Sequence, residues 1–235
     1  MPETRNINAL SPLDGRYAGK LAGLSRLSGE GALARRRALV ECRYLAKLCA
    51  TSGIKARRLT AAEKKILEKL PLLSDADVLK IIEIEEKGLG PVPATRHDVK
   101  AVEYFLKAKL ARTSLRDLTE LVHFALTSED VNNISYALLL RDSLREELLP
   151  ALEEILAALD ALAANYAAAP LLARTHGQPA VPTTFGKEFR VFHARLSRQV
   201  RQLKALRICA KLRRLGQLQR PRRGLSLREL GEILP

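Results

Sequence analysis

Residues 149–166 have the sequence LPALEEILAALDALAANY, and this stretch decides the fold. Its apolar seam alternates spacings of three and four, through Leu149, Leu152, Leu156, Leu159, Ala163 and Tyr166. That spacing is typical of one face of an α-helix that packs against other helices. Because a lone helix with such a seam needs partners, we expect this segment to lie in a multi-helix bundle that is also a candidate subunit interface.

The rest of the chain favours helices too. Aromatic residues make up 4% of the 235 residues and Trp is absent, whereas Leu and Ala are abundant, which suits packed helices better than sheets. Pro150 is the one expected break or kink. Helical patterns cover residues 32–51, 60–70, 74–87, 99–110, 115–126, 127–166 and 184–211. We therefore predict an all-α fold: a small N-terminal helical domain at 1–114, part of a long central bundle at 115–211, and a basic tail at 212–235.

Charge is distributed unevenly along the chain. The net charge is +14, but residues 1–200 hold 30 Lys and Arg against 24 Asp and Glu, while residues 201–235 hold 10 against 2. The mildly basic body suits an anionic small-molecule substrate. The tail has no aromatic interleaving and no recognised motif, which argues against nucleic-acid binding. The alternative is a non-catalytic helical protein whose basic tail binds nucleic acid or an acidic partner.

Cysteine use and hydropathy indicate a cytoplasmic protein. Cys42, Cys49 and Cys209 form no metal-type cluster and do not pair off, which is typical of free thiols in a reducing compartment. No apolar run approaches the ~20 residues that span a bilayer. The polar N-terminus has no secretory segment, so we expect no membrane association.

Thr175-His176-Gly177-Gln178-Pro179 lies between two helical patterns and cannot continue either helix. An imidazole in a rigid polar loop is a natural general acid or base, because its ordinary pKa lies near neutrality. The alternative is a turn histidine that bonds the backbone. His123 and His193 lie within helical patterns, where a structural role is the simpler interpretation.

Three further stretches carry groups that could hold an anion. Arg96-His97-Asp98 stands at a helix start, where His97 is either a site residue or a capping-region residue. Thr127 and Ser128 precede two acids, so they are N-caps or, with the free N–H groups of the helix, carboxylate ligands. Arg16 lies in a plausible turn beside Gly15, where it could also grip a phosphate. Together these groups favour acid–base chemistry on a polyanionic substrate.

Four motifs in this order resemble the adenylosuccinate lyase family of the fumarase/aspartase superfamily. They are SPLDGRY at 11–17, TRHDVKAVEY at 95–104, TSEDVNN at 127–133 and THGQPA at 175–180, and the likeness covers about residues 5–211. The resemblance implies a homotetramer built on a long helical bundle, without metal or organic cofactor. It implies elimination of fumarate from adenylosuccinate, giving AMP, and from succinylaminoimidazole carboxamide ribotide.

The resemblance also implies a role for each candidate residue. Arg16 and Tyr17 would bind the phosphate region of the substrate, and Thr127 and Ser128 would hold a substrate carboxylate. Arg96, His97 and Asp98 would line the site. His176 would be the general acid that protonates the departing nitrogen. The family's general base is a serine on a mobile loop in the second half of its members.

The chain departs from the family after about Lys211. The catalytic-serine loop is absent from residues 1–235, so we expect little lyase activity from this chain alone. Codons can be chosen for Gln217–Gly224 that, read one nucleotide later, encode Asn-Phe-Asn-Ala-His-Val-Val, which is close to the run that the family has at this point. The hypothesis is a frameshift near Lys211. Sequencing the DNA tests it, because the hypothesis requires a one-base shift that restores a lyase-like continuation.

Overall fold

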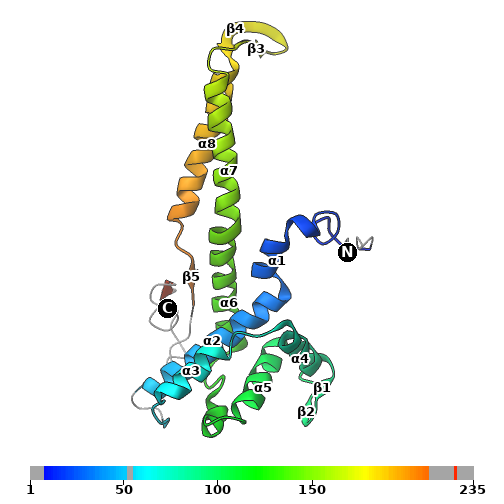
Figure 1. The fold of residues 1–235 in the computed structure, drawn as a ribbon, viewed down its shortest axis with the longest axis vertical. Coiled ribbons are helices and arrows are strands. Elements are labelled where there is room, and N and C mark those ends of the chain that lie inside the picture. The colour runs from blue at the N-terminus through cyan, green and yellow to red at the C-terminus, as the bar shows by residue number, and fades with distance from the viewer. Residues whose placement is uncertain (1–7, 52–54, 212–224, 227–235) are drawn as a thin grey trace. The chain divides into compact units, whose positions relative to one another are not determined.

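The computed structural model describes residues 8–51 and 55–211 and the backbone of residues 225–226 (Figure 1). Most of them are helical, as predicted. The helices are η1 (Ala18–Lys20), α1 (Ala22–Ser28), α2 (Glu30–Ala50), α3 (Ala61–Lys69), α4 (Asp75–Glu86), α5 (Asp98–Leu110), η2 (Arg116–Leu121), α6 (Ser128–Ser143), the π-helical η3 (Leu144–Leu148), α7 (Leu149–Asn165) and α8 (Phe185–Ala205). The strands form three antiparallel pairs: β1 (Gly88–Leu89) with β2 (Val92–Pro93), β3 (Pro170–Thr175) with β4 (Gln178–Thr184), and β5 (Cys209–Ala210) with β6 (Leu225–Ser226).

Two compact units make up the chain. One contains the described residues up to Arg141 and those from Ile208 onward, and the other is Asp142–Arg207. These units are defined by compactness, whereas the domain boundary expected after residue 114 rests on the sequence pattern. The division into domains at residue 114 therefore stays a prediction. The basic tail expected at 212–235 lies outside the described residues, except for the backbone of residues 225–226.

Helix α2 runs between two hydrophobic clusters of the first unit. One cluster joins its residues Ala38 and Leu45 to α4, α5 and η2. The other joins Val40 to Val99 of α5 and to the first turns of α6. Each fully buried leucine or valine contributes about 1.5–3 kcal/mol relative to an exposed one. Helix α2 is therefore packed against apolar residues on two sides.

Helix starts in this unit follow the sequence closely. A capping box begins α3, with Thr60 and Glu63 bonding each other's backbone N–H groups. Ser74 and Asp77 form the same arrangement at the start of α4. A cap of this kind typically contributes about 1 kcal/mol.

Three predicted segments differ from the structure. The helix expected at 115–126 is the 3-10 helix η2 followed by a turn, because the buried Glu41 carboxylate accepts the His123 N–H that a helix would use internally. The last helix ends at Ala205 rather than near Lys211. The chain is then extended, Ala210 is buried in the second cluster, and the Lys211 N–H donates to Asn133 Oδ1 at 2.6 Å. The stretch around His176 is a β-hairpin rather than an irregular loop.

The second unit is an antiparallel helix pair capped by this hairpin (Figure 1). The rings of Tyr166 and Phe189 pack at a tilt of 44°, with their centroids 6.3 Å apart. Ion pairs join Arg190 to Asp160 and Lys204 to Glu153 along the pair. Pro150 lies in the first turn of α7, directly after the π-helical η3. The predicted irregularity at Pro150 is thus confirmed as a local widening of the helix, which accommodates the missing N–H.

Gly186 allows the first turn of α8 to approach the end of α7. A Cβ at this position would lie 2.5 Å from the Ala163 carbonyl oxygen and 2.6 Å from Ala167 Cα. We expect Gly186→Ala to destabilise the helix pair by about 1–3 kcal/mol, measured by urea denaturation and by amide exchange in α8. Gly19→Ala is the control, because a Cβ there meets nothing within 4 Å. Equal stability of the two variants would contradict the close approach.

Candidate active site

His97 is the N-cap residue of α5, and Asp98 is the first residue of that helix. The Val99 N–H donates to Asp98 Oδ1 at 2.7 Å, and the His97 Nδ1 lies 3.3 Å from the same oxygen. The second carboxylate oxygen of Asp98 accepts a hydrogen bond from the Arg37 guanidinium. Asp98 therefore fixes the start of α5 and faces one ring nitrogen of His97.

The other ring nitrogen of His97 faces α6. His97 Nε2 and Ser128 Oγ are 3.3 Å apart, within hydrogen-bonding distance. The structure thus brings three of the sequence-predicted residues, Asp98, His97 and Ser128, into one continuous chain of contacts. The imidazole of His97 is about half exposed, so a ligand can reach it.

Thr127 is engaged in a different way. Its hydroxyl donates to Asp130 Oδ2 at 2.8 Å and accepts from the Asp130 N–H at 3.3 Å, while its N–H donates to the same carboxylate. This is a capping box that closes the N-terminus of α6 with a buried carboxylate. The N-cap interpretation of Thr127 is therefore confirmed, and of the two hydroxyls only that of Ser128 is directed at His97.

The electrostatics keep Asp98 ionised. Partial burial acts to raise the pKa of its carboxyl, but the Val99 N–H and the Arg37 guanidinium outweigh burial and hold that pKa below its ordinary value. At neutral pH the site therefore contains a carboxylate beside a histidine, which favours a proton on the facing Nδ1 atom. With the proton on Nδ1, the Nε2 atom is free of hydrogen and can accept a hydrogen bond from the Ser128 hydroxyl.

Arg96 directly precedes His97, and its backbone has a left-handed conformation with φ of 51°. The Thr95 and Arg96 N–H groups donate to the Ile84 and Glu85 carbonyls at the end of α4, and these bonds hold the strained backbone. Among the described residues, no hydrogen bond or ion pair involves the Arg96 side chain, which is exposed. An exposed guanidinium on a fixed backbone is available to an anion.

Arg16 and Tyr17 lie at the other end of the described chain, in a turn that Ser11 and Pro12 close. The Tyr17 N–H donates to the Pro12 carbonyl at 2.9 Å, and the Arg16 guanidinium lies 5.1 Å from the centroid of the Tyr17 ring. Both side chains are exposed. Within the described parts of the chain, no hydrogen bond, ion pair or ring contact joins them to His97 or Ser128, so the structure does not bring these two groups together.

His176 and Gly177 are the two turn residues of the β3–β4 hairpin, between the paired residues Thr175 and Gln178. Both have positive φ, 50° and 74°, as a two-residue type I′ turn requires. The preferred first residue of such a turn is Asn or Asp, so His is an unusual choice. His176 is exposed at the tip of the hairpin. It belongs to the second unit, whereas His97 belongs to the first.

Left-handed backbone gathers at the candidate residues. The described non-glycine residues with positive φ are Arg96, His123, Ala125 and His176. Two of these belong to the predicted site, and the other two form the turn that leads into Thr127. Such conformations persist only where the surrounding structure enforces them, and they are often associated with functional sites.

Sequence reasoning missed the residues that hold this turn. Glu41 of α2 is buried, accepts the His123 N–H at 3.1 Å, and places Oε1 2.5 Å from the His123 Nδ1. The interpretation of His123 as structural is confirmed, but its partner is a buried carboxylate rather than a helix. No local signal identifies Glu41, since an acid in α2 looks like any residue of a solvated face.

The Glu41 carboxylate raises the pKa of the His123 imidazole above its ordinary value, and partial burial opposes this only in part. Because the folded-state pKa is raised, the stabilisation is fully present below the unfolded pKa of about 6.5 and is lost as pH rises through the folded pKa. We expect the difference in unfolding free energy between wild type and His123→Asn to shrink over that window. A difference independent of pH, in denaturation series from about pH 5.5 to 9, would exclude the pair.

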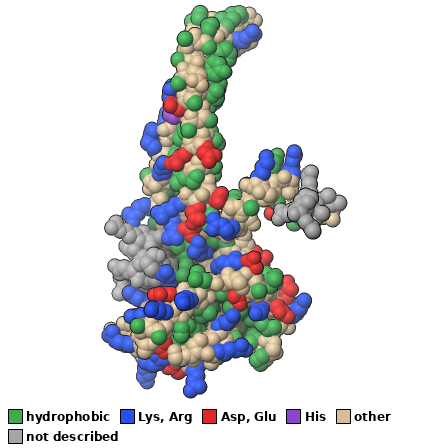
Figure 2. All heavy atoms as spheres, viewed as in Figure 1, with side chains coloured by type: hydrophobic (Ala, Val, Ile, Leu, Met, Phe, Trp, Pro, Cys, Tyr) green, Lys and Arg blue, Asp and Glu red, His purple; other side chains and the backbone are tan. Residues whose placement is uncertain are grey.

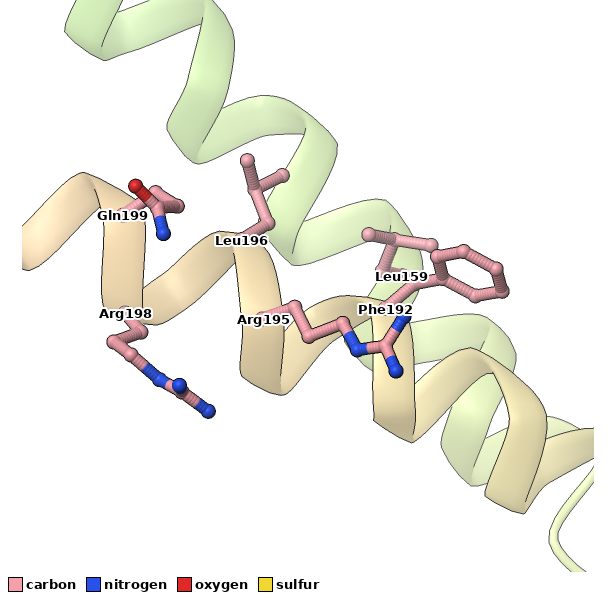
Figure 3. Close-up of a pocket in the computed structure, with 6 residues that line it drawn as sticks. All are labelled: Leu159, Phe192, Arg195, Leu196, Arg198 and Gln199. Carbon is pink, nitrogen blue, oxygen red and sulfur yellow. The ribbon is translucent and has the colours of Figure 1, made fainter.

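A shallow open groove lies elsewhere, on the α7–α8 pair (Figure 3). It is lined by Leu159, Phe192, Arg195, Leu196, Arg198 and Gln199, none of which is a predicted site residue. Leu159 comes from α7 and lies beside Phe192 of α8 in the close-up. Figure 2 shows further hydrophobic side chains on the surface of this helix pair. The groove is thus an uncovered helix face rather than an enclosed ligand cavity.

Comparison with known proteins accounts for the grouping of these motifs. The sequence model of a family described as lyase matches residues 27–216. The chain belongs to this lyase family. Over 213 residues, it is 41% identical to the adenylosuccinate lyases of Vibrio cholerae serotype O1 and Escherichia coli K12. Over 208 residues, it is 40% identical to the adenylosuccinate lyase of Dictyostelium discoideum.

The matches cover 89% of the lyase-family chain with the two bacterial relatives, but only 45% of each relative. The chain thus spans less than half the length of these curated proteins and corresponds to their N-terminal half.

Solved structures show the same fold at lower identity. A fumarate lyase from Mesorhizobium sp. BNC1 matches with a TM-score of 0.67 and 21% identity over 91% of this chain and 48% of that chain. The β-carboxy-cis,cis-muconate cycloisomerase of Acinetobacter calcoaceticus matches with a TM-score of 0.67 and 19% identity over 93% and 48%. The prediction of a helical fragment of this fold is confirmed. No described helix is long and apolar enough to cross a membrane.

Proposed function

We propose that this chain supplies the substrate-holding and acid-donating groups of an adenylosuccinate lyase. The reaction is the elimination of fumarate from adenylosuccinate, giving AMP, and from succinylaminoimidazole carboxamide ribotide. The relatives named above are adenylosuccinate lyases, and they support this reaction class. No step of the proposed role of these residues calls on a metal or an organic cofactor.

The observation that carries the proposal is the contact between His97 and Ser128, made at the N-terminus of α6. A carboxylate placed there meets a hydroxyl, an imidazole and the nearby exposed guanidinium of Arg96. The hydroxyl and the guanidinium are donors, and His97 orients the hydroxyl; a charge that develops on a carboxylate during elimination requires donors of this kind. Because the Thr127 hydroxyl is occupied by Asp130, Ser128 is the principal carboxylate ligand and Thr127 shapes the helix start.

The remaining roles follow the chemistry of β-elimination. The departing nitrogen must be protonated as its bond to carbon breaks, and His176 is the candidate acid. Arg16 and Tyr17 are the candidate ligands of the substrate phosphate, since an exposed guanidinium next to an aromatic hydroxyl suits a dianion. Asp98 holds His97 rather than touching the substrate.

We also propose a cytoplasmic homo-oligomer, as a tetramer. The three described cysteines form no disulfide bond, and two of them are buried, which suits a reducing compartment. A second apolar stripe runs from Leu148, the last residue of η3, to Ile155 and Leu162 of α7, and each of these side chains is more than a third exposed. A helix that is apolar on two faces is typical of a bundle with further members.

The test is a chimaera that joins residues 1–211 to the C-terminal half of the Escherichia coli enzyme. We expect it to release fumarate from adenylosuccinate, and Ser128→Ala to lower kcat/KM by about 10- to 100-fold, the loss of one charge-assisted hydrogen bond. Ser74→Ala is the control, because it removes a hydroxyl from another helix start at a distance from His97. A Ser128→Ala chimaera as active as the control would overturn the assignment.

A further inference from the structure

Two charged residues of α2 are buried one helical turn apart. Arg37 is 6% exposed and Glu41 is 1% exposed. Arg and Glu are almost never buried to this degree unless they are paired. Each has its partners in a segment that the proposed site uses.

Arg37 joins the starts of α5 and α6. Its Nε donates to Asn132 Oδ1 at 2.8 Å, and its guanidinium pairs with the Asp98 carboxylate. Asn132 lies four residues after Ser128, on α6, and Asp98 follows His97 on α5. One planar fork with fixed geometry therefore sets the distance between the helix that carries Ser128 and the helix that begins at His97.

Glu41 holds the segment that delivers Ser128. Its two carboxylate oxygens bind the backbone N–H and the ring of His123, so the left-handed turn of His123 and Ala125 is fixed from the inside. That turn ends at Thr127, where α6 is capped. Without the carboxylate, a buried N–H would lose its partner and the turn would relax towards ordinary backbone angles.

We propose that Arg37 and Glu41 are positioning residues that set the contact between His97 and Ser128. The inference rests on the proposed function, since it assigns a purpose to the site that these residues hold. Arg37 orients Asp98, which determines the ring nitrogen of His97 that carries the proton. Glu41 fixes the turn at His123, which determines the position of the Ser128 hydroxyl. Neither side chain reaches the substrate.

The tautomer of His97 tests Arg37 directly. In the wild-type chain at alkaline pH, ring ¹⁵N shifts should show the neutral imidazole protonated mainly on Nδ1, because Nδ1 faces Asp98 and Nε2 faces Ser128. Arg37→Met should move the population towards the Nε2 form, because the Asp98 carboxylate loses the contact that holds it in place, and Arg37→Lys should restore the Nδ1 form in part by holding Asp98 again. Unchanged shifts in Arg37→Met, or a wild-type ring protonated on Nε2, would overturn the assignment.

Amide exchange tests Glu41. Glu41→Gln should speed exchange at His123 and through residues 124–130 by about tenfold, because one acceptor of the turn is weakened. The control is Glu63→Gln, which alters another buried carboxylate, one that pairs with Arg57 at the start of α3. Equal exchange in the two variants would reduce Glu41 to an ordinary structural residue. Should Arg37→Met not fold, Arg37→Gln takes its place with the same expected tautomer change, because its shorter amide keeps a polar group at the site but no guanidinium for Asp98.

Failure of the proposed function is distinguishable. If the His97 tautomer changes on substitution of Arg37 but the chimaera has no lyase activity, the positioning role is supported and the proposed reaction is rejected. An active chimaera whose His97 signals ignore both substitutions would do the reverse.

Discussion

Replacement of His176 by Asn should lower the kcat of the chimaera for adenylosuccinate cleavage by about 10²–10⁴-fold, the usual contribution of a positioned general acid. The same substitution should stabilise the hairpin slightly, because Asn is the preferred first residue of a type I′ turn and Gly177 already supplies the second. Activity and stability would thus change in opposite directions. A residue that served only the turn could not give that result.

The matched control is His193→Asn, which removes a half-buried histidine from α8 in the same unit. It should leave kcat within a few-fold of the wild-type value. Steady-state kinetics with a fumarate readout, together with thermal denaturation, supply both quantities. A His176→Asn chimaera that keeps its activity would remove the proposed acid, and a parallel loss of stability and activity would return His176 to the turn-residue interpretation.

Self-association of the chain is the second large effect that we expect. Ile155 is 49% exposed and Phe192 is 58% exposed, on opposite members of the α7–α8 pair. Burying one such side chain contributes about 1.5–3 kcal/mol, so these exposed side chains should promote association of copies of the chain. The double variant Ile155→Glu with Phe192→Glu should raise the dissociation constant at least about 100-fold, because it also places unpaired carboxylates in the interface.

Sedimentation velocity over a range of concentrations measures this effect. Leu79→Glu is the control, since Leu79 is 66% exposed on α4 in the first unit and has no part in the proposed face. It should leave the association unchanged. A wild-type chain that stays monomeric and melts cooperatively would contradict the account of α7.

Local signals in the sequence predicted much of the helical fold. The helical patterns at 60–70 and 74–87 placed two helix starts to within about a residue, and the leucine seam of 149–166 identified the long helix of the second unit. These features succeed because caps and apolar periodicity act within a few residues. The hairpin around His176 escaped prediction because its prolines argue equally for a loop, and a two-stranded sheet accepts proline at its edges.

The candidate site divides in the same way. The motifs located His97, Asp98, Thr127 and Ser128. They do not distinguish the two hydroxyls, because the hydrogen bond between Thr127 and Asp130, which leaves Ser128 to face His97, appears only in the structure. Arg37 and Glu41 could not be predicted at all, because burial of a charged pair depends on segments 60 to 95 residues away. Long-range partners are what single-sequence patterns lack.

The most direct test of the account is a titration of the ¹⁵N-labelled chain with adenylosuccinate and, separately, with AMP, which lacks the succinyl group. The account predicts saturable shifts at Arg96, His97 and Ser128 with adenylosuccinate, and shifts confined to the region of Arg16 and Tyr17 with AMP. Ser128→Ala should remove the first set and leave the second. Identical shifts with both ligands, or none at His97 and Ser128 with adenylosuccinate, would contradict the assignment of this site to the substrate carboxylate.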